Sequence, residues 1–405
     1  MTNNPQPRES MSWKGFFFLS VIFPLFLLLL VECLFRLVAA TGVFTSEKEK
    51  NVTLEMPSWM VPGTTKPKAF SESEIQWMSN FQSGDGFRVH MKPSRTFTVL
   101  DTFSWKERNK PTFTVTSNSA GFRGSNFSFT KPDGTIRVVA FGDSSTFGWG
   151  VNDDDTYLSR LLEGLTQRHP ERTFELINFA MPGDSSEFGK LVFNTFIDNV
   201  APDIVIIGFG ANDARLATLP HRQAVKFFQQ QGVLQRVRSF LLRNSELIKT
   251  LSRTLSQVTE KPSGEPLKKQ AAVSIKEYRE NLRYFHRRSK KAGAHTVIFV
   301  SACTPASYQK AMRKVAENKE GVYVPAQALL RKAIAGIQEG AISHPELESI
   351  KNIYGSVLNK QPVLYVTSDA CHPNTIGHTL IEEHMMKVLT ENEVFLSSLM
   401  NSPAS

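Results

Sequence analysis

The chain has 405 residues, of which 41% are hydrophobic, and its formal net charge is +9 at pH 7. This length is enough for one large domain with a packed core and further segments. The positive charge does not indicate nucleic-acid binding, because no nucleic-acid motif accompanies it. With three cysteines the chain lacks a disulfide framework, and no Cys/His cluster has the spacing of a zinc site.

Residues 15–44 form a long apolar stretch that indicates a transmembrane helix. The 17 residues Gly15–Val31 carry no charge, and at 1.5 Å per residue roughly 20 residues cross a bilayer. Glu32 and Arg36 follow one helical turn apart, where they can form an ion pair. Because basic residues precede the span, we expect residues 1–14 in the cytoplasm and the rest outside it, in the periplasm or at the cell surface.

The end of this stretch leaves two interpretations open. Val38-Ala39-Ala40 resembles a signal-peptidase site, so the segment can be removed from the mature chain. The length of the apolar region and its two late charges favour an uncleaved signal anchor instead. Residues 45–68 follow with charges, two prolines and a Gly-Thr-Thr tract, which is typical of a linker.

Residues 69–134 contain short β-prone pieces separated by turns, such as Arg95–Leu100 and Thr112–Thr116. Asn118–Gly124 is rich in turn-forming residues. We expect this segment to be an N-terminal extension of mixed structure that packs on the main domain.

Residues 135–395 alternate apolar, β-branched runs with helical patterns, which is typical of an α/β domain. The apolar runs predict buried strands, and they lie at Ile136–Phe141, Phe174–Ala180, Ile204–Phe209, Thr296–Ser301 and Val363–Thr367. The helical patterns lie at Tyr157–Leu165, Phe188–Asn199, Ser274–Lys291 and Ala326–Gln338. This alternation implies a three-layer α/β/α sandwich with a five-stranded parallel sheet covered on both faces. Residues 396–405 form a C-terminal tail.

Residues 215–266 are longer than a crossover between two strands needs, and they predict a helical insertion. Within them, Val233–Val258 has apolar residues at helical spacing on one side and Arg and Lys on the other. This pattern fits an amphipathic helix docked on the domain, but also a lid or a helix on a membrane surface. Residues 222–291 hold 17 Lys and Arg against five Glu. That charge suits solvated helix faces, or a surface that meets anionic lipid or an acidic polymer.

Polar motifs follow four of the five predicted strands. The first, Gly142-Asp143-Ser144, combines a tight glycine turn with residues that cap a starting helix. It places a serine at the carboxyl edge of the sheet, where ligands bind. The serine is a candidate nucleophile, provided that a base and oxyanion donors lie elsewhere in the chain. The other motifs are Asn178–Gly183, Gly208–Asp213 and Asp369–Asn374.

These motifs resemble the blocks of the SGNH hydrolases, also called the GDSL lipase/esterase superfamily. The family's blocks are a nucleophilic Ser in a Gly-Asp-Ser turn, a Gly, a Gly-x-Asn-Asp and an Asp-x-x-His. All occur here in that order, from about Ile136 to Leu389. The sequence departs from the family name at Ser145, where the name has Leu. The resemblance, which extends to bacterial membrane-anchored members, implies a flavodoxin-like SGNH hydrolase fold.

The resemblance also implies a role for each motif residue. Ser144 is the nucleophile, His372 the base and Asp369 the partner of the base. The oxyanion donors are the backbone N–H groups of Ser144 and Gly183 and the side-chain amide of Asn212.

The chemistry of the residue types suits these roles. A serine hydroxyl needs a base to become nucleophilic, and imidazole titrates near working pH. An Asp three residues before the His can fix the ring by a hydrogen bond. Glycine lets backbone approach a ligand closely, and Asn supplies amide donors without a charge. No metal or organic cofactor is needed.

Some assignments have alternatives. Gly183-Asp184-Ser185-Ser186 repeats the first motif, so Ser185 is a rival nucleophile, although it stands in the second block. Asp213 fits a structural role better than a catalytic one. Cys303 and Cys371 each follow a predicted strand and can approach each other at the sheet edge, so a disulfide between them is one possibility. In the alternative, Cys371 is a small packing residue.

We therefore expect a membrane-anchored, extracytoplasmic serine ester hydrolase that works through an acyl-enzyme. The expected substrate is an acyl ester, such as an O-acetyl group on envelope carbohydrate or on a lipid. The closest alternative is an O-acyltransferase that modifies a cell-envelope glycan. Another is a catalytically silent envelope-assembly module on the same scaffold. The acyl chain length, the leaving group and the oligomeric state stay open.

Overall fold

The computed structural model divides the chain into two compact units. One comprises Met1–Thr53 and Phe227–Leu267, and the other comprises Leu54–Lys226 and Lys268–Ser405. The structure describes residues 17–40, 80–82, 89–100, 112–229, 245, 248, 269–349, 364–366, 371–392 and 395.

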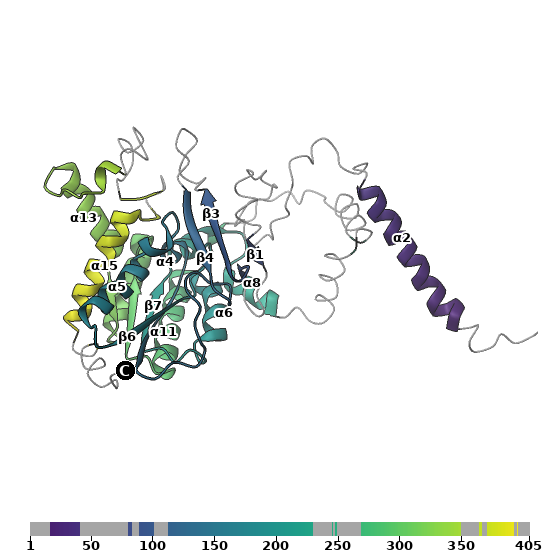
Figure 1. Ribbon diagram of the computed structural model, residues 1–405, viewed down its shortest axis with the longest axis horizontal. Helices are drawn as coiled ribbons and strands as arrows, with labels where there is room; N and C mark the ends of the chain where they lie inside the picture. Colours follow the sequence, from purple (N-terminus) through teal and green to yellow (C-terminus); the bar gives the residue numbers. More distant parts are fainter. Residues whose placement is uncertain are drawn as a thin grey trace, which may run out of the picture. The chain divides into compact units, whose positions relative to one another are not determined.

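The larger unit is built on a five-stranded parallel sheet, which confirms the predicted fold class (Figure 1). Its strand order is β11-β10-β7-β5-β6. The strands are β5 (Thr135–Gly142), β6 (Thr173–Asn178), β7 (Ile204–Gly208), β10 (Thr296–Val300) and β11 (Val322–Val324). Strand β5 lies between β6 and β7, so the loops that follow these three strands emerge side by side at one edge.

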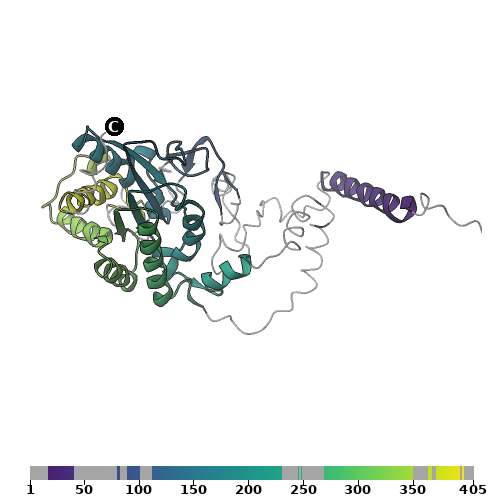
Figure 2. The ribbon, with the colours of Figure 1, turned by 90° about the horizontal axis from the view of Figure 1, so that it is seen from below.

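Helices cover both faces of this sheet, as Figures 1 and 2 show. Alternate side chains of β5 point to opposite layers: Val138 and Ala140 pack in one core, and Val139 and Phe141 pack in the other. The first core is completed by α5 (Tyr157–Arg168), α13 (Ala326–Gln338) and α15 (Thr375–Thr390). The second is completed by α6 (Ser186–Phe196), α11 (Ile275–Lys291) and α12 (Ala306–Glu317).

The remaining elements are short or lie at the N-terminus. They are η1 (Phe18–Ile22), α2 (Phe23–Ala40), β1 (Phe81–Gln82), β2 (His90–Met91), β3 (Arg95–Leu100), β4 (Thr112–Ser117), α4 (Ser144–Phe147), η3 (Asp153–Asp155), α7 (Ala211–Ala214), β8 (Leu216–Ala217), α8 (His221–Gln229) and β9 (Gln270–Ala271).

The fifth strand of the sheet is β11, so the prediction of a sheet strand at Val363–Thr367 was wrong. Within the described part of that run, Tyr365 forms an isolated antiparallel bridge with Pro373. Leu364, Tyr365 and Val366 are buried in the cores, which explains the apolar pattern that suggested a strand. Strand β11 is only three residues long, too short to give a periodic signal.

The β-prone pieces of the N-terminal segment pair as an antiparallel hairpin of β3 and β4, with Arg95 opposite Ser117. Phe113 of this hairpin packs with Trp149 in a third apolar cluster. The N–H of Thr116 donates to Asp153 Oδ2 at 2.9 Å. The hairpin is therefore fixed to the chain that follows α4.

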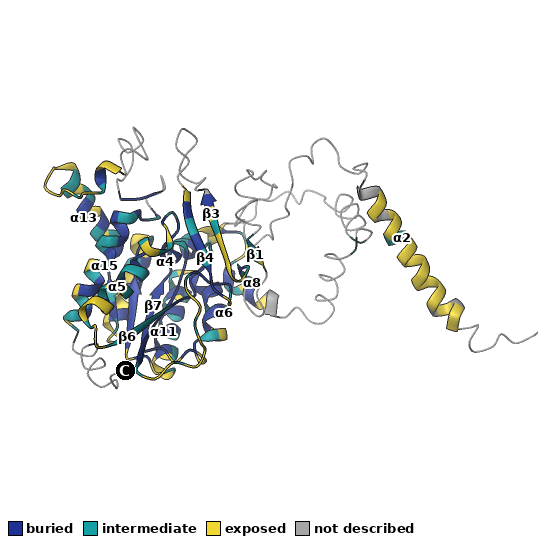
Figure 3. Cartoon of the chain, in the orientation of Figure 1, coloured by how far each residue is buried: buried dark blue, intermediate teal, exposed yellow. Residues whose placement is uncertain are grey.

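Helix α2 carries the predicted ion pair, with Arg36 Nε 2.9 Å from Glu32 Oε1. The hydroxyl of Ser245 donates to the other carboxylate oxygen of Glu32 at 2.7 Å. Most of the helix's large apolar side chains are exposed (Figure 3). Among the helices that the structure describes, none combines the length and apolarity that a membrane crossing requires.

Several predictions concern residues outside the described ranges. They are the cytoplasmic segment 1–14, the linker 45–68, the tail 396–405, the carboxylate Asp369, and all of Val233–Val258 except Ser245 and Ile248. These stay predictions.

The packing of α15 on α5 depends on a buried histidine. His378 Nδ1 accepts a hydrogen bond from the N–H of Tyr157 at 3.0 Å, and the two rings stack with centroids 5.7 Å apart. Burial and the nearby cation of Arg123 lower the pKa of His378 to about 3. The ring is therefore neutral in the folded protein at any pH near 7.

We predict that His378 makes the protein acid-sensitive. Because its folded pKa lies below the ordinary value, the unfolded chain takes up the extra proton. The contribution of this depressed pKa to the stability of the folded protein is present above pH 6.5 and is lost as the pH falls toward 3. Lowering the pH from 7 to 5 should therefore reduce the free energy of unfolding by about 2 kcal/mol through His378 alone.

The measurement is urea unfolding of the parent and of His378→Asn at both pH values. Asn can still accept the Tyr157 N–H but does not titrate. The variant should therefore lose less stability on acidification than the parent. All other titrating groups are common to both proteins and cancel in the comparison. An equal loss in the two proteins would contradict the prediction.

Candidate active site

The turn after β5 presents a single side chain to solvent. Gly142 allows a close approach, since a Cβ there would lie 2.4 Å from Thr146 Oγ1 and 2.6 Å from the carbonyl oxygen of Gly208. Asp143 caps α4 by accepting the N–H of Ser145 at 2.9 Å. From 141 to 149, Ser144 is the only residue that is not buried. As the first residue of α4, its N–H has no partner within the helix.

His372 reaches this serine from a distant part of the chain. His372 Nε2 lies 2.7 Å from Ser144 Oγ, across 228 positions in the sequence. The histidine's carbonyl accepts the N–H of Val366 at 2.8 Å, which fixes the backbone that carries the ring. The predicted nucleophile and base are therefore in hydrogen-bond contact, while Asp369 lies outside the described residues.

A disulfide bond immediately precedes the histidine. Cys303 and Cys371 are bonded, with Cα atoms 4.7 Å apart, so the expectation that Cys371 is only a small packing residue was wrong. The two cysteines do approach each other at the sheet edge, as their positions after predicted strands allowed. The bond ties the residue before His372 to the segment that follows β10.

The two other predicted oxyanion donors flank the serine. Gly183 follows β6 and Asn212 follows β7, and β5 lies between these strands. Gly183 has a φ of +81°, in the left-handed region that favours glycine. Asn212 is buried, and its Nδ2 donates to the carbonyl of Asp184 at 3.0 Å. An amide has two N–H donors, so this bond fixes the side chain and leaves the second donor for a ligand.

Two carboxyl groups are buried beside the site. Burial raises the pKa of Asp143 to about 7, although hydrogen bonds from Ser145 and Ala211 oppose the shift. Burial also raises the pKa of Asp213 to about 7. Asp213 accepts both the N–H and the hydroxyl of Ser186. It therefore joins the loop after β7 to the start of α6, which agrees with the structural role expected for it.

Arg123, which sequence reasoning did not assign to the site, supports the far end of α4. Its Nη1 donates to the carbonyls of Phe147 and Gly148 at 3.0 and 2.7 Å, and its Nε pairs with Asp153 at 2.7 Å. Its side chain is buried. The carbonyls at the end of this short helix thus have a charged partner.

Ser185, the rival nucleophile, also lies against a histidine. His221 Nδ1 is 2.8 Å from Ser185 Oγ, a contact for which the sequence held no signal. A Ser–His contact alone therefore does not identify the nucleophile. Ser185 is 0% exposed, whereas Ser144 is partly exposed. An ester carbonyl can reach only an accessible hydroxyl, so the geometry favours Ser144.

A sequence model of the GDSL-like lipase/acylhydrolase family matches residues 140–380. No curated protein matches the chain. Among the described residues, no cluster of three or more His, Cys, Asp and Glu side chains is placed to hold a metal ion.

Several solved structures are similar to this chain at low sequence identity. TesA is 14% identical, with a TM-score of 0.37 over 63% of this chain and 98% of that chain. The lipase/acylhydrolase from Enterococcus faecalis is 17% identical, with a TM-score of 0.36 over 63% and 96%. Axe2, an acetylxylan esterase from Geobacillus stearothermophilus, is 15% identical, with a TM-score of 0.36 over 62% and 93%.

We predict that the disulfide stabilises the fold substantially. It closes a loop of 68 residues, and loop-closure entropy for that length corresponds to about 4 kcal/mol. Guanidinium unfolding of Cys303→Ser should show a loss of this order. Cys33 is not disulfide-bonded, so Cys33→Ser is the matched control and should unfold like the parent. Equal stability of the parent and Cys303→Ser would contradict the prediction.

Proposed function

Because the chain belongs to the GDSL-like lipase/acylhydrolase (SGNH) family, it is a carboxylic ester hydrolase, and we propose that Ser144 is its nucleophile and His372 its general base. The observation that carries this proposal is the 2.7 Å contact between Ser144 Oγ and His372 Nε2, made by a serine that is partly exposed. A nucleophile and base must lie within this reach for the proton to pass between them.

The proposed reaction is a double displacement. Ser144 Oγ attacks the ester carbonyl while His372 Nε2 takes the hydroxyl proton. The tetrahedral intermediate collapses to an acyl-enzyme, and His372 returns the proton to the leaving alcohol. Water then attacks the acyl-enzyme with His372 again as base. Asp369, three residues earlier, would accept the Nδ1 proton and stabilise the imidazolium.

The negative charge on the carbonyl oxygen needs fixed donors. We assign them to the N–H groups of Ser144 and Gly183 and to Asn212 Nδ2. The positions of these residues after β5, β6 and β7 support the assignment. So does the contact that Asn212 makes with the loop following Gly183.

Aromatic side chains lie beside the base. Trp149 lies beside the imidazole of His372, with ring centroids 6.3 Å apart, and Phe113 packs edge-on against the indole at 5.4 Å. Both aromatic side chains are buried in one cluster with Phe147. We propose an O-acetyl or similar ester on envelope carbohydrate or lipid. Transfer of the acyl group to a sugar hydroxyl would use the same residues.

We also propose that residues 15–44 anchor the enzyme in a membrane, with the catalytic domain outside the cytoplasm. The exposed apolar side chains of α2 support an apolar environment for this helix. The bond between Cys303 and Cys371 supports an oxidising compartment, where disulfides persist.

We predict that p-nitrophenyl acetate hydrolysis depends on the proposed residues. In the purified full chain, kcat should fall by roughly 10⁴-fold or more for Ser144→Ala and His372→Ala. Loss of one oxyanion donor in Asn212→Ala should cost on the order of 100-fold. Ser185→Ala is the control for the nucleophile, and it should retain far more activity than Ser144→Ala.

Undiminished turnover by Ser144→Ala would overturn the assignment.

Product analysis with a glycan acceptor separates ester hydrolysis from acyl transfer. Free acetate is the expected product of the esterase, and acetylated acceptor is the product of the transferase.

The membrane anchor has its own test. When membranes from cells that make the full chain are extracted with alkaline carbonate, the protein should stay in the pellet. A variant that lacks residues 15–44 should appear in the supernatant, and it serves as the control for other modes of attachment. Release of the full chain into the supernatant would refute the anchor.

A further inference from the structure

The first residue of α8 lies against the loop that carries the proposed oxyanion glycine. His221 Nδ1 is 2.8 Å from Ser185 Oγ, two residues beyond Gly183. Both Ser185 and His221 are buried, and the imidazole packs on the ring of Phe188 with centroids 4.5 Å apart. The proposed reaction uses neither polar side chain.

The backbone of His221 is fixed independently of this contact. Its N–H donates to the carbonyl of Ala272 at 2.7 Å, and the N–H of Ala272 donates to Arg215 O at 2.7 Å. The flanking strands β8 and β9 pair antiparallel, with Leu216 opposite Ala271. The imidazole is therefore attached to a backbone that these hydrogen bonds hold in place.

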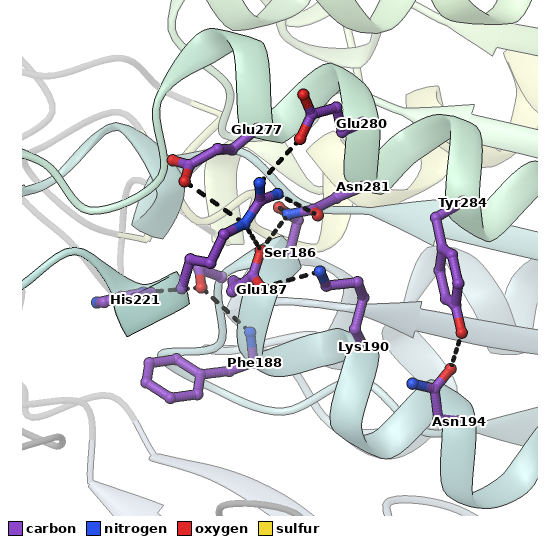
Figure 4. Close-up of polar contacts among 12 residues, drawn as sticks. Ser186, Glu187, Phe188, Lys190, Asn194, His221, Glu277, Glu280, Asn281 and Tyr284 are labelled. Carbon is purple, nitrogen blue, oxygen red and sulfur yellow. Dashed lines mark hydrogen bonds and ion pairs between the residues drawn. The ribbon is translucent and has the colours of Figure 1, made fainter. Parts of the chain in front are cut away.

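Arg222, the next residue, adds ion pairs that hold the same backbone. Arg222 lies 3.5 Å from Glu187 of α6, 3.4 Å from Glu277 of α11 and 2.8 Å from Glu280 of α11. Figure 4 shows Glu187, Glu277 and Glu280 near one another, with His221 at the start of α8. The start of α8 is thus held against the starts of α6 and α11.

The loop from Gly183 to Ser186 influences two proposed oxyanion donors at once. Gly183 supplies one of them directly from its backbone. The carbonyl of Asp184 holds the second, because it accepts a hydrogen bond from Asn212 Nδ2 at 3.0 Å. A side chain that fixes Ser185 therefore fixes the peptide units that aim both donors.

We propose that His221 is a positioning residue that holds this loop through Ser185 and so sets the geometry of the oxyanion hole. The inference rests on the proposed function, since the roles of Gly183 and Asn212 come from it. Oxyanion donors act only within about 2.7–3.1 Å of the charged oxygen. A displacement of about 1 Å can cost on the order of 100-fold in rate.

The test uses two substitutions of His221. His221→Phe keeps an aromatic ring against Phe188 but removes the hydrogen bond to Ser185, and it should lower kcat for p-nitrophenyl acetate at least tenfold. KM should change less than twofold, since the oxyanion forms only in the transition state. His221→Asn keeps a polar atom near the Nδ1 position and should restore kcat to within about threefold of the parent.

His286 provides the matched control. It is as buried as His221, at 8% exposed, and lies on α11 with its ring stacked 6.5 Å from that of Phe299. His286→Phe should leave kcat within twofold of the parent. A comparable loss of kcat in His286→Phe would overturn the proposal, since the effect would then reflect general packing.

Two further measurements apply to the same proteins. In a double-mutant cycle, His221→Phe should have little further effect on kcat once Ser185 is Ala, because the two act through one contact. Hydrogen exchange of the amides from 183 to 186 should be faster in His221→Phe and unchanged in His286→Phe. The exchange measurement does not depend on activity.

The outcomes separate this inference from the proposed function. If the parent turns over substrate through Ser144 and His221→Phe matches it in both kcat and loop exchange, the inference alone fails. If the parent lacks Ser144-dependent turnover, the proposed function fails and the inference fails with it.

Discussion

The contact between Ser144 Oγ and His372 Nε2 spans 228 positions of sequence, and the fold holds its two partners by different means. The serine begins α4, two residues after the end of β5, and the hydrogen bonds of β5 to strands on both sides restrict the backbone before it. The histidine belongs to no sheet strand. Its backbone is held by the N–H of Val366 and by the disulfide of the preceding Cys371. The bridge between Tyr365 and Pro373 adds to these two restraints on the segment that carries the base.

The same pair of residue types occurs twice at this edge of the sheet, and burial separates the two. Ser144 is partly exposed and can meet a substrate, whereas Ser185 is fully buried, where its hydroxyl contacts His221 and accepts the N–H of Phe188 at the start of α6. In our proposals, the first contact activates a hydroxyl and the second restrains a backbone. Residue identity sets what a side chain can do, and the surrounding packing selects which of those roles it performs.

Much of the site could be predicted because each motif follows an apolar run, and three of those runs are adjacent strands. In the fourth motif His372 lies against Ser144, although the described part of the run at Val363–Thr367 forms no strand of the sheet. Strand β11 was not predicted, because a run of three residues is too short to show a hydrophobic periodicity. The contact of His221 with Ser185 could not be predicted, since 36 positions separate them and no local pattern marks a buried histidine at a helix start. The disulfide between Cys303 and Cys371 was only one possibility, because the sequence does not give the distance between the two cysteines in the fold.

The most direct test of the central claim is to find which residue becomes covalently modified. The full chain is treated with a fluorophosphonate, digested, and analysed by mass spectrometry of the labelled peptide. A single adduct on Ser144, abolished in His372→Ala, is the predicted result, because the probe reacts only with a serine activated by its base. An adduct on Ser185, or a folded chain that takes no label, would contradict the claim.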